Sequence, residues 1–242
     1  MKKVPEIINY SGNTALLDAP KISIVGTRHP IVYTQQQTLD LAQKLSSVGV
    51  VIVSGAAMGV DGIAHRGAGP NQTIAVLPCG LGYRYPRIHT ALLSEIQQEG
   101  LLLSQFDHDF KQMAWSFVVR NEMVVALGDV LIVTEAALGS GSMRSVAYAQ
   151  KMGKKIYTLA HRNGDSEGTM ALVKSGEAEV IYDIDLFVAQ YGVLKKIEDD
   201  PLLQFCQSGP TYEEALQRFG AEIALYELEG KIMIENGCVR LS

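Results

Sequence analysis

Three short segments rich in glycine and serine each follow an apolar run and precede a helical pattern. The first of them spans residues 26–30. Gly26 lets backbone amides approach a ligand closely, Thr27 adds a hydroxyl, and Arg28 offers a two-pronged guanidinium that suits a phosphate. Taken alone, this segment is explained equally well as a tight turn that carries an exposed arginine.

The second segment, residues 54–61, opens a helix, so we expect unpaired N–H groups and the positive end of a helix dipole to face outward. It matches neither the GxGxxG pattern nor a P-loop, and NAD and ATP are therefore weakly supported. Asp61 is expected to brace the loop, and His65 to be a satisfied structural histidine. The residues expected to contribute to binding are Ser54, Gly55, Ala57 and Gly59.

The third segment, residues 135–142, supplies Ser140, Gly141 and Ser142, with Glu135 expected to support the loop. Loops at the carboxyl ends of neighbouring parallel strands share one edge of a sheet, so the three segments predict a single anion-binding cradle. The cradle holds no obvious pairing of a nucleophile with a base. We therefore expect it to bind a phosphodiester rather than cleave one, and we expect no enzymatic activity.

Cations alternate with aromatic residues between the second and third segments. Lys111, Phe117, Arg120 and Asn121 form a pattern that suits a single nucleic-acid strand, because cations meet phosphates and rings stack on bases. The alternative is an amphipathic helix that buries its aromatic side chains. We expect burial for Trp115 and leave both interpretations open for Phe117.

Short apolar runs alternate with helical patterns from about residue 20 onward. This order predicts an α/β protein with an extended Rossmann-like fold, whose mostly parallel sheet is covered on both faces. Ligands of such sheets bind beyond the carboxyl ends of the strands. The expected strands are 22–25, 50–53, 73–77, 101–104, 130–133 and 155–159, and the expected helices are 36–47, 54–68, 91–99, 115–126 and 142–151.

The chain changes character near residue 197. Residues 183–200 predict a last helix and a linker, and residues 201–242 predict three helices followed by a hairpin around Asn236 and Gly237. We divide the chain into a Rossmann-like domain, 1–196, with an N-terminal extension at 1–20, and a winged-helix-like domain, 197–242. The second domain carries nine acidic and three basic groups. We therefore expect it to have no major role in binding a polyanion.

The composition of the 242 residues is that of an ordinary globular protein, with 47% hydrophobic and 19% charged residues and a net charge of −5. No apolar run approaches the roughly 18 residues that a membrane span needs. Without a recognisable signal peptide, we expect a cytoplasmic protein and no membrane partner. Cys79, Cys206 and Cys238 form no CxxC pair and are not clustered with histidines, so we expect no metal site and no cofactor.

Several of these segments together resemble the DNA-processing protein A (DprA/Smf) family, and the resemblance runs from about residue 7 to about residue 185. All blocks occur in the family's order, which makes the combination more specific than any single block. The matching stretches are Ile24 to Arg28, Val53 to Asp61 with His65, Thr73 to Leu81 with Tyr85-Pro86, Arg120-Asn121, Val133 to Ala136, and Ser140 to Ser142.

The chain departs from the family pattern at three places. Glu122 stands where the family has the second arginine of Arg-Asn-Arg, so one possible phosphate contact is missing. Pro78 replaces a glycine. Met143 and Arg144 replace the usual Leu-Ile, and Arg144 would add positive charge at the rim of the cradle.

The resemblance implies a homodimer that binds single-stranded DNA without strong sequence preference. It further implies that the protein protects incoming DNA during natural transformation and competence, and helps load the RecA recombinase for DNA recombination. Relatives often carry a small winged-helix-like domain at the C-terminus. Two alternatives remain: a nucleotide-binding sensor, and a Rossmann-like protein that hydrolyses nucleoside monophosphates. The second alternative would need a PGGxGT loop followed by a glutamate, where this chain has residues 138–142.

Overall fold

The computed structural model describes residues 7–192, 200–206, 209–235 and 237–241. The chain separates into two compact units, Met1–Val193 and Leu194–Ser242. The domain boundary predicted between residues 196 and 197 falls in the segment 193–199, which lies outside the described residues, as do residues 1–6 of the predicted N-terminal extension. Each unit is described by itself below.

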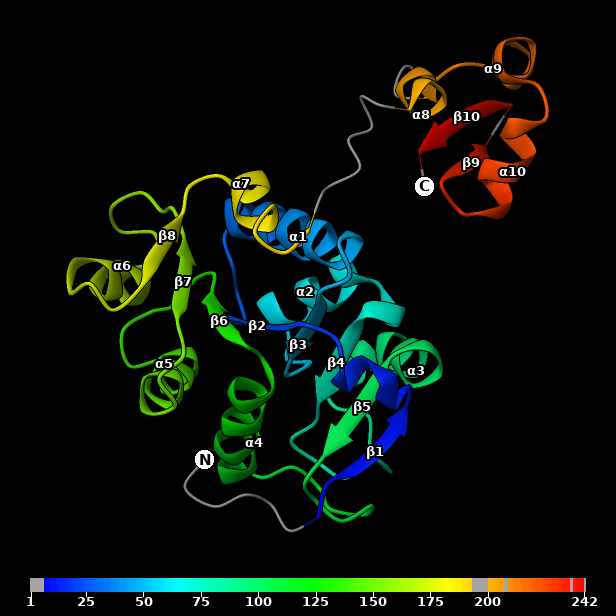
Figure 1. Ribbon diagram of the computed structural model, residues 1–242. Coiled ribbons are helices and arrows are strands. Elements are labelled where there is room, and N and C mark those ends of the chain that lie inside the picture. The colour runs from blue at the N-terminus through cyan, green and yellow to red at the C-terminus, as the bar shows by residue number, and fades with distance from the viewer. Residues whose placement is uncertain (1–6, 193–199, 207–208, 236, 242) are drawn as a thin grey trace. The chain divides into compact units, whose positions relative to one another are not determined.

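The first unit is built on one eight-stranded sheet with the order β1-β5-β4-β3-β2-β6-β7-β8 (Figure 1). Only the edge strand β1 is antiparallel to its neighbour; the other pairs are parallel. The mostly parallel, Rossmann-like sheet predicted from the sequence is therefore confirmed. The strands are β1 (Asn9–Gly12), β2 (Lys21–Val25), β3 (Val51–Ser54), β4 (Thr73–Val76), β5 (Leu101–Ser104), β6 (Val130–Val133), β7 (Ile156–Leu159) and β8 (Glu179–Ile181).

Helices cover both faces of this sheet. One apolar cluster joins alternate side chains of the central strands to the inner faces of α4, α5 and α6, and a second joins the opposite side of β4 and β5 to α3. The crossovers β2–α1–β3, β3–α2–β4 and β4–α3–β5 all step across the sheet in the same direction. Because such crossovers are right-handed, α1 and α2 lie on the same face of the sheet as α3. The helices are α1 (Val32–Ser47), α2 (Val60–Ala68), α3 (Thr90–Glu99), α4 (Ala114–Leu127), α5 (Gly141–Lys151), α6 (Glu167–Lys174) and α7 (Ile184–Val188).

The strand order reverses at β2. From β2 the chain continues to one side through β3, β4 and β5, and then returns through α4 to the other side, where β6 pairs with β2. Loops that leave β2 and β6 therefore diverge toward opposite faces of the sheet and leave a crevice between them. This reversal fixes where a ligand site can form.

All six predicted strands are present, as β2 to β7, within one or two residues of the predicted bounds. The edge strands β1 and β8 were not predicted. The strand β1 has the sequence NYSG and alternates between half-buried and exposed positions, so it lacks the apolar run that revealed the central strands. The strand β8 has only three residues. Of the helix and linker predicted over 183–200, α7 is present, and residues 193–199 lie outside the described part.

In its described residues the second unit contains three helices and a two-stranded antiparallel sheet, which confirms the small C-terminal domain. Thr211 and Glu214 form a capping box: the Thr211 hydroxyl accepts from the Glu214 amide at 3.3 Å, and the Glu214 carboxylate accepts from the Thr211 amide at 2.9 Å. In the predicted turn, Gly237 has a φ of +75°, while Asn236 lies outside the described residues. The elements are α8 (Pro201–Cys206), α9 (Tyr212–Phe219), α10 (Glu222–Leu228), β9 (Ile232–Glu235) and β10 (Cys238–Leu241).

A buried histidine fastens α2 to the sheet. The Thr73 hydroxyl donates to the Ile52 carbonyl at 2.8 Å and lies 2.7 Å from Nδ1 of His65. Because the hydroxyl hydrogen is already used, Nδ1 must carry the proton and donate to Thr73. Burial, together with the neighbouring charges of His89, Arg120 and Arg66, lowers the pKa of His65 to about 3. His65 is therefore neutral in the folded protein, in keeping with the structural role predicted for it. Only its Nδ1 is satisfied, however: its Nε2 is buried without a partner among the described residues.

Because His65 stays neutral when folded, we expect the free energy of unfolding of the first unit to depend on pH. In the unfolded chain His65 titrates near its ordinary pKa of about 6.5. Below that pH the unfolded state takes up a proton that the folded state refuses, so stability is complete above about pH 6.5 and is lost as the pH falls toward 3. His65 changes the free energy of unfolding by at most about 1.4 kcal/mol per pH unit.

The measurement is urea unfolding of the full chain at several pH values between about 7 and 5, followed by tryptophan fluorescence. The chain has one tryptophan, Trp115, so this signal reports on the first unit alone. The His65→Gln variant keeps an N–H donor for Thr73 but does not titrate. Its free energy of unfolding should depend less steeply on pH than that of the wild type; equal slopes would refute the assignment.

Candidate functional site

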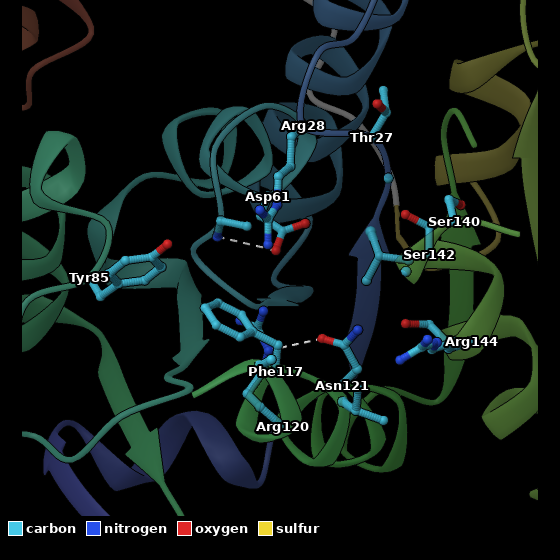
Figure 2. A pocket seen from close by; sticks show the side chains of 17 residues that line it. Thr27, Arg28, Asp61, Tyr85, Phe117, Arg120, Asn121, Ser140, Ser142 and Arg144 are labelled. Atoms are coloured by element: carbon cyan, nitrogen blue, oxygen red, sulfur yellow. Dashed lines mark hydrogen bonds between the residues drawn. The ribbon is translucent and has the colours of Figure 1, made fainter. Parts of the chain in front are cut away.

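A cleft of about 610 Å³ opens at the carboxyl ends of β2, β3 and β6, where the strand order reverses. It lies where the three glycine-rich segments were predicted to converge, and the N-terminal half of α4 forms its remaining wall (Figure 2). The predicted binding residues that line it are Gly26, Thr27, Arg28, Ala57, Phe117, Arg120, Asn121, Ser140, Gly141 and Ser142.

Backbone hydrogen bonds join the first loop to its neighbours. The Thr27 amide donates to the Glu135 carbonyl at 2.9 Å, and the Val60 amide donates to the Thr27 carbonyl at 3.1 Å. A Cβ atom on Gly26 would lie 2.6 Å from the Val60 side chain, so a glycine is needed where β2 passes under α2. The three loops are thus one connected structure, and Arg28 projects from it.

Arg28 reaches across the cleft toward α4. Its guanidinium carbon lies 5.6 Å from the ring centroid of Phe117, a cation–π distance. The Phe117 ring also meets Tyr85 edge-on, with centroids 5.6 Å apart and planes at 69°. No carboxylate among the described residues lies within salt-bridge distance of Arg28, so its N–H groups remain available to a ligand.

The N-terminus of α5 forms the opposite wall. Ser140 is the N-cap of this helix, but its side chain makes no capping hydrogen bond, and the following amides of Gly141 and Ser142 belong to the first turn. The hydroxyls of Ser140 and Ser145 are buried without a partner among the described residues. Unsatisfied donors at the positive end of a helix dipole make an anion site.

The two walls of the cleft differ in chemistry. Figure 2 shows Ser140, Ser142 and Arg144 gathered on one side, and Tyr85 with Phe117 on the other. Hydroxyls, amides and an exposed arginine thus face two aromatic rings across the cleft, and the arrangement can hold an anion on one side and a flat apolar group on the other.

The second loop differs from the prediction. Two of its amides are turned inward: the Ala57 amide donates to the Asp61 carboxylate at 3.3 Å, and the Val60 amide donates to the Thr27 carbonyl at 3.1 Å. The Ser54 hydroxyl is buried and donates to the Ile24 carbonyl at 2.6 Å. Of the binding residues predicted in this loop, Ser54, Gly55 and Gly59 do not line the cleft and Ala57 does, so most of the loop supports the site from behind.

Gly59 shows why this loop needs a glycine. Its φ is +75°, and a Cβ atom there would lie 2.4 Å from the Thr27 carbonyl oxygen. Glu135, predicted as a loop support, accepts a hydrogen bond from the Ile31 amide at 3.1 Å. The Glu135 carboxylate thereby holds the first loop against the third and is not among the lining groups.

Arg120 occupies a different position from the surface track predicted for it. It is 3% exposed, and its Nη1 donates to the Gly55 carbonyl and, at 3.0 Å, to the Val76 carbonyl. Burial lowers the pKa of Arg120, while the charge of Asp61 opposes that shift; burial raises the pKa of Asp61, with Arg120 opposing. Arg120 therefore clamps the floor of the cleft.

Two residues near the start of α4 lie elsewhere than expected. Lys111, predicted to contribute to binding a nucleic-acid strand, does not line the cleft; its Nζ lies 5.8 Å from the ring centroid of Tyr83, and its part in binding stays a prediction. Trp115, which we expected to be buried, is 51% exposed. The reason is the helical geometry of α4. Phe117 points into the cleft, and Trp115, two residues earlier, points away from it. The Trp115 ring packs edge-on against Phe106, with ring centroids 5.7 Å apart.

Sequence reasoning missed the role of Tyr85. The Tyr-Pro pair was recognised as part of a motif, but its ring reaches the cleft only because the loop after β4 folds back toward α4. Arg144 was expected at the rim, and it lines the cleft as an exposed side chain.

Two other kinds of site are absent from the described residues. No group of three or more histidine, cysteine, aspartate or glutamate side chains is placed to hold a metal ion. No helix there combines the length and the hydropathy needed to cross a membrane.

Known proteins resemble this chain in sequence. Among curated relatives, a putative DNA processing protein DprA from Mycobacterium tuberculosis is 35% identical over 191 residues, which cover 76% of this chain and 49% of that protein. DNA processing protein DprA from Bacillus subtilis is 30% identical over 188 residues, covering 76% and 63% respectively. The chain thus spans about half to two thirds of the length of these relatives.

Solved structures resemble it as well. DNA processing protein A from Helicobacter pylori, described for its single-stranded DNA binding mode, is 43% identical with a TM-score of 0.77, over 78% of this chain and 88% of that one. DprA from Streptococcus pneumoniae is 30% identical with a TM-score of 0.72, over 78% and 68%. A molybdenum cofactor binding protein from Rippkaea orientalis, 18% identical with a TM-score of 0.51, shares only the fold.

The family model for DNA recombination-mediator protein A matches residues 1–192, which contain the whole sheet and every residue of the cleft. The resemblance seen in the sequence motifs is thereby confirmed. This chain belongs to the DNA recombination-mediator protein A family, also known as DprA/Smf.

Proposed function

We propose that this protein binds single-stranded DNA in the cleft between the β2 and β6 loops. The observation that carries the proposal is that two groups in the same cleft can bind an anion. Arg28 makes no salt bridge to a described carboxylate, and the buried Ser140 hydroxyl at the start of α5 has no partner among the described residues. In this proposal the backbone phosphate lies between Arg28 and the α5 amides. Charge-assisted hydrogen bonds from a guanidinium and a helix N-terminus are well suited to a phosphodiester.

The aromatic wall completes a nucleotide site. Phe117 and Tyr85 lie on the side of the cleft opposite the serines (Figure 2). In this proposal the base attached to the bound phosphate stacks against this wall. Stacking on a ring accepts any base, because every base has a π-face. Binding by phosphate and stacking contacts predicts little sequence preference.

Relatives support a strand over a mononucleotide as the ligand. The Helicobacter pylori protein, 43% identical, is described as binding single-stranded DNA, and its match covers 78% of this chain. By this kinship we propose that the present protein protects incoming single strands during natural transformation and helps load the RecA recombinase. We further propose that it acts as a homodimer, because two clefts on one long strand would raise its affinity.

We propose binding without catalysis. Among the described lining residues there is no cysteine, histidine or lysine, and the one carboxylate, Asp61, accepts the Ala57 amide and faces Arg120. Hydrolysis of a nucleoside monophosphate would need a free carboxylate near the sugar. The Glu135 carboxylate accepts the Ile31 amide and does not line the cleft, so it is not placed to fill that role.

Replacing Arg28 with alanine should weaken binding to a single-stranded oligonucleotide by about tenfold to a hundredfold, because a hydrogen bond to a charged group contributes about 1.5–3 kcal/mol. The measurement is a gel shift or fluorescence anisotropy. Arg66→Ala is the matched control: it removes the same charge from an exposed position in the last turn of α2, away from the carboxyl edge of the sheet. Equal affinity of the Arg28→Ala variant and the wild type would contradict the proposal.

A salt titration separates the proposed ligand from the alternatives. For a single strand, log K should fall with log salt with a slope of about −0.7 for each phosphate contacted. If the protein binds a single nucleotide, the slope of log K against log salt should be near the value for one phosphate contact. Incubation with a panel of nucleoside monophosphates, monitored for released base, tests hydrolysis in parallel, and base release that Ser140→Ala abolishes would overturn the proposal of binding alone.

The acidic C-terminal unit should be dispensable for DNA binding. A variant that ends at residue 192 keeps the sheet, the cleft and the core that joins them, and it loses a unit rich in carboxylates. Its affinity for single-stranded DNA should stay within about threefold of the full chain's, since a polyanion gains little from an acidic partner. A large loss of affinity in a folded, dimeric truncation would assign DNA contacts to the second unit.

A further inference from the structure

A second cation–aromatic pair lies beyond the cleft. Lys111, in the loop after β5, has its Nζ 5.8 Å from the ring centroid of Tyr83, which belongs to the loop after β4. Both loops leave the carboxyl edge of the sheet, as the three cleft loops do. The pair repeats the chemistry of Arg28 and Phe117, whose separation is 5.6 Å.

The two loops that carry this pair are fixed to each other. The Gly80 amide donates to the Phe110 carbonyl at 2.9 Å, and the Gly82 amide donates to the His108 carbonyl at 3.0 Å. A Cβ atom on Gly80 would lie 1.9 Å from the Asp107 carbonyl oxygen, so the close approach of the loops requires a glycine there. The backbone next to Lys111 is therefore held in place by the neighbouring loop.

The second pair is close to the cleft along the chain. Tyr85 lines the cleft against Phe117, and Tyr83 precedes it by two residues, so their Cα atoms are at most about 7 Å apart. A strand that leaves the cleft past Tyr85 would therefore come within reach of Tyr83 and Lys111. Figure 2 places Tyr85 on the side of the cleft opposite Ser142 and Arg144.

The charge of Lys111 is available to a ligand. Its side chain is exposed, and no carboxylate of the described residues forms a salt bridge with it, although Asp107 and Asp109 lie in the same loop. A cation held over a ring can accept a phosphate from the solvent side while the ring offers an edge or a face to a base.

We propose that Lys111 and Tyr83 form a second nucleotide subsite, which binds the phosphate and base of a nucleotide that leaves the cleft past Tyr85. The subsite rests on the proposed function, since it takes the continuation of the same strand. It extends the footprint toward the β4 and β5 loops. A ligand long enough to occupy only the cleft does not reach it.

The test compares oligothymidylates of increasing length, from about 4 to about 16 nucleotides, by fluorescence anisotropy on the full-length protein. Lys111→Ala should bind the shortest oligonucleotide like the wild type and lose about threefold to tenfold in affinity for the longer ones. Its salt slope on the long oligonucleotide should be shallower by about one contact. Lys111→Arg should restore most of the loss.

Lys174→Ala is the matched control, because it removes an exposed lysine from the last turn of α6, and it should bind all lengths like the wild type. Equal losses for Lys111→Ala at every length would place the lysine in the cleft itself, and no loss at any length would remove it from the interface; either result overturns the second subsite. Arg28→Ala, measured alongside, should lose affinity at every length. If it does not, the proposed function fails, and that failure is separate from the outcome for Lys111.

Discussion

The buried guanidinium of Arg120 is the contact on which the cleft depends. A cation at 3% exposure must find acceptors inside the protein, and Arg120 takes them from the Gly55 and Val76 carbonyls and from the neighbouring charge of Asp61. Removing one partner of such a buried charge typically destabilises a protein by about 3–5 kcal/mol. The carboxyl ends of β3 and β4 and the middle of α4 are therefore held in one arrangement, and a Cβ atom at position 55 would displace the guanidinium from it.

The composition of the cleft follows from this clamp. The helix α4 is the long crossover that carries the chain from β5 to β6, and Arg120 fixes its rotation against the sheet. Phe117 lies one turn before Arg120 on the same side of the helix, so its ring is directed into the cleft, where it meets Arg28. The aromatic wall is thus positioned by a buried charge, and the anionic wall by the unsatisfied end of α5.

The local pattern of apolar and polar residues was sufficient to predict much of the fold. Each central strand is a short apolar run, as at residues 50–53, and the parallel order brings the loops after β2 and β6 to one edge whatever their detailed sequence. Long-range contacts decided what the pattern left open. Whether Arg120 points outward or inward depends on the Gly55 and Val76 carbonyls, far away in the chain, and the exposure of Trp115 depends on the rotation of α4.

Arginines at two positions near the cleft show why net charge is a poor guide to the ligand. The charge of Arg120 is satisfied internally, so it contributes to order and adds little to the attraction of a polyanion. Arg28 rests on a ring that does not neutralise it, and its full charge faces the cleft. A chain with a net charge of −5 can therefore bind phosphate through a local field, because the screening length of about 8 Å at physiological salt isolates the cleft from distant carboxylates. What matters is which cations remain unpaired at the carboxyl edge of the sheet, and the structure distinguishes these by their partners.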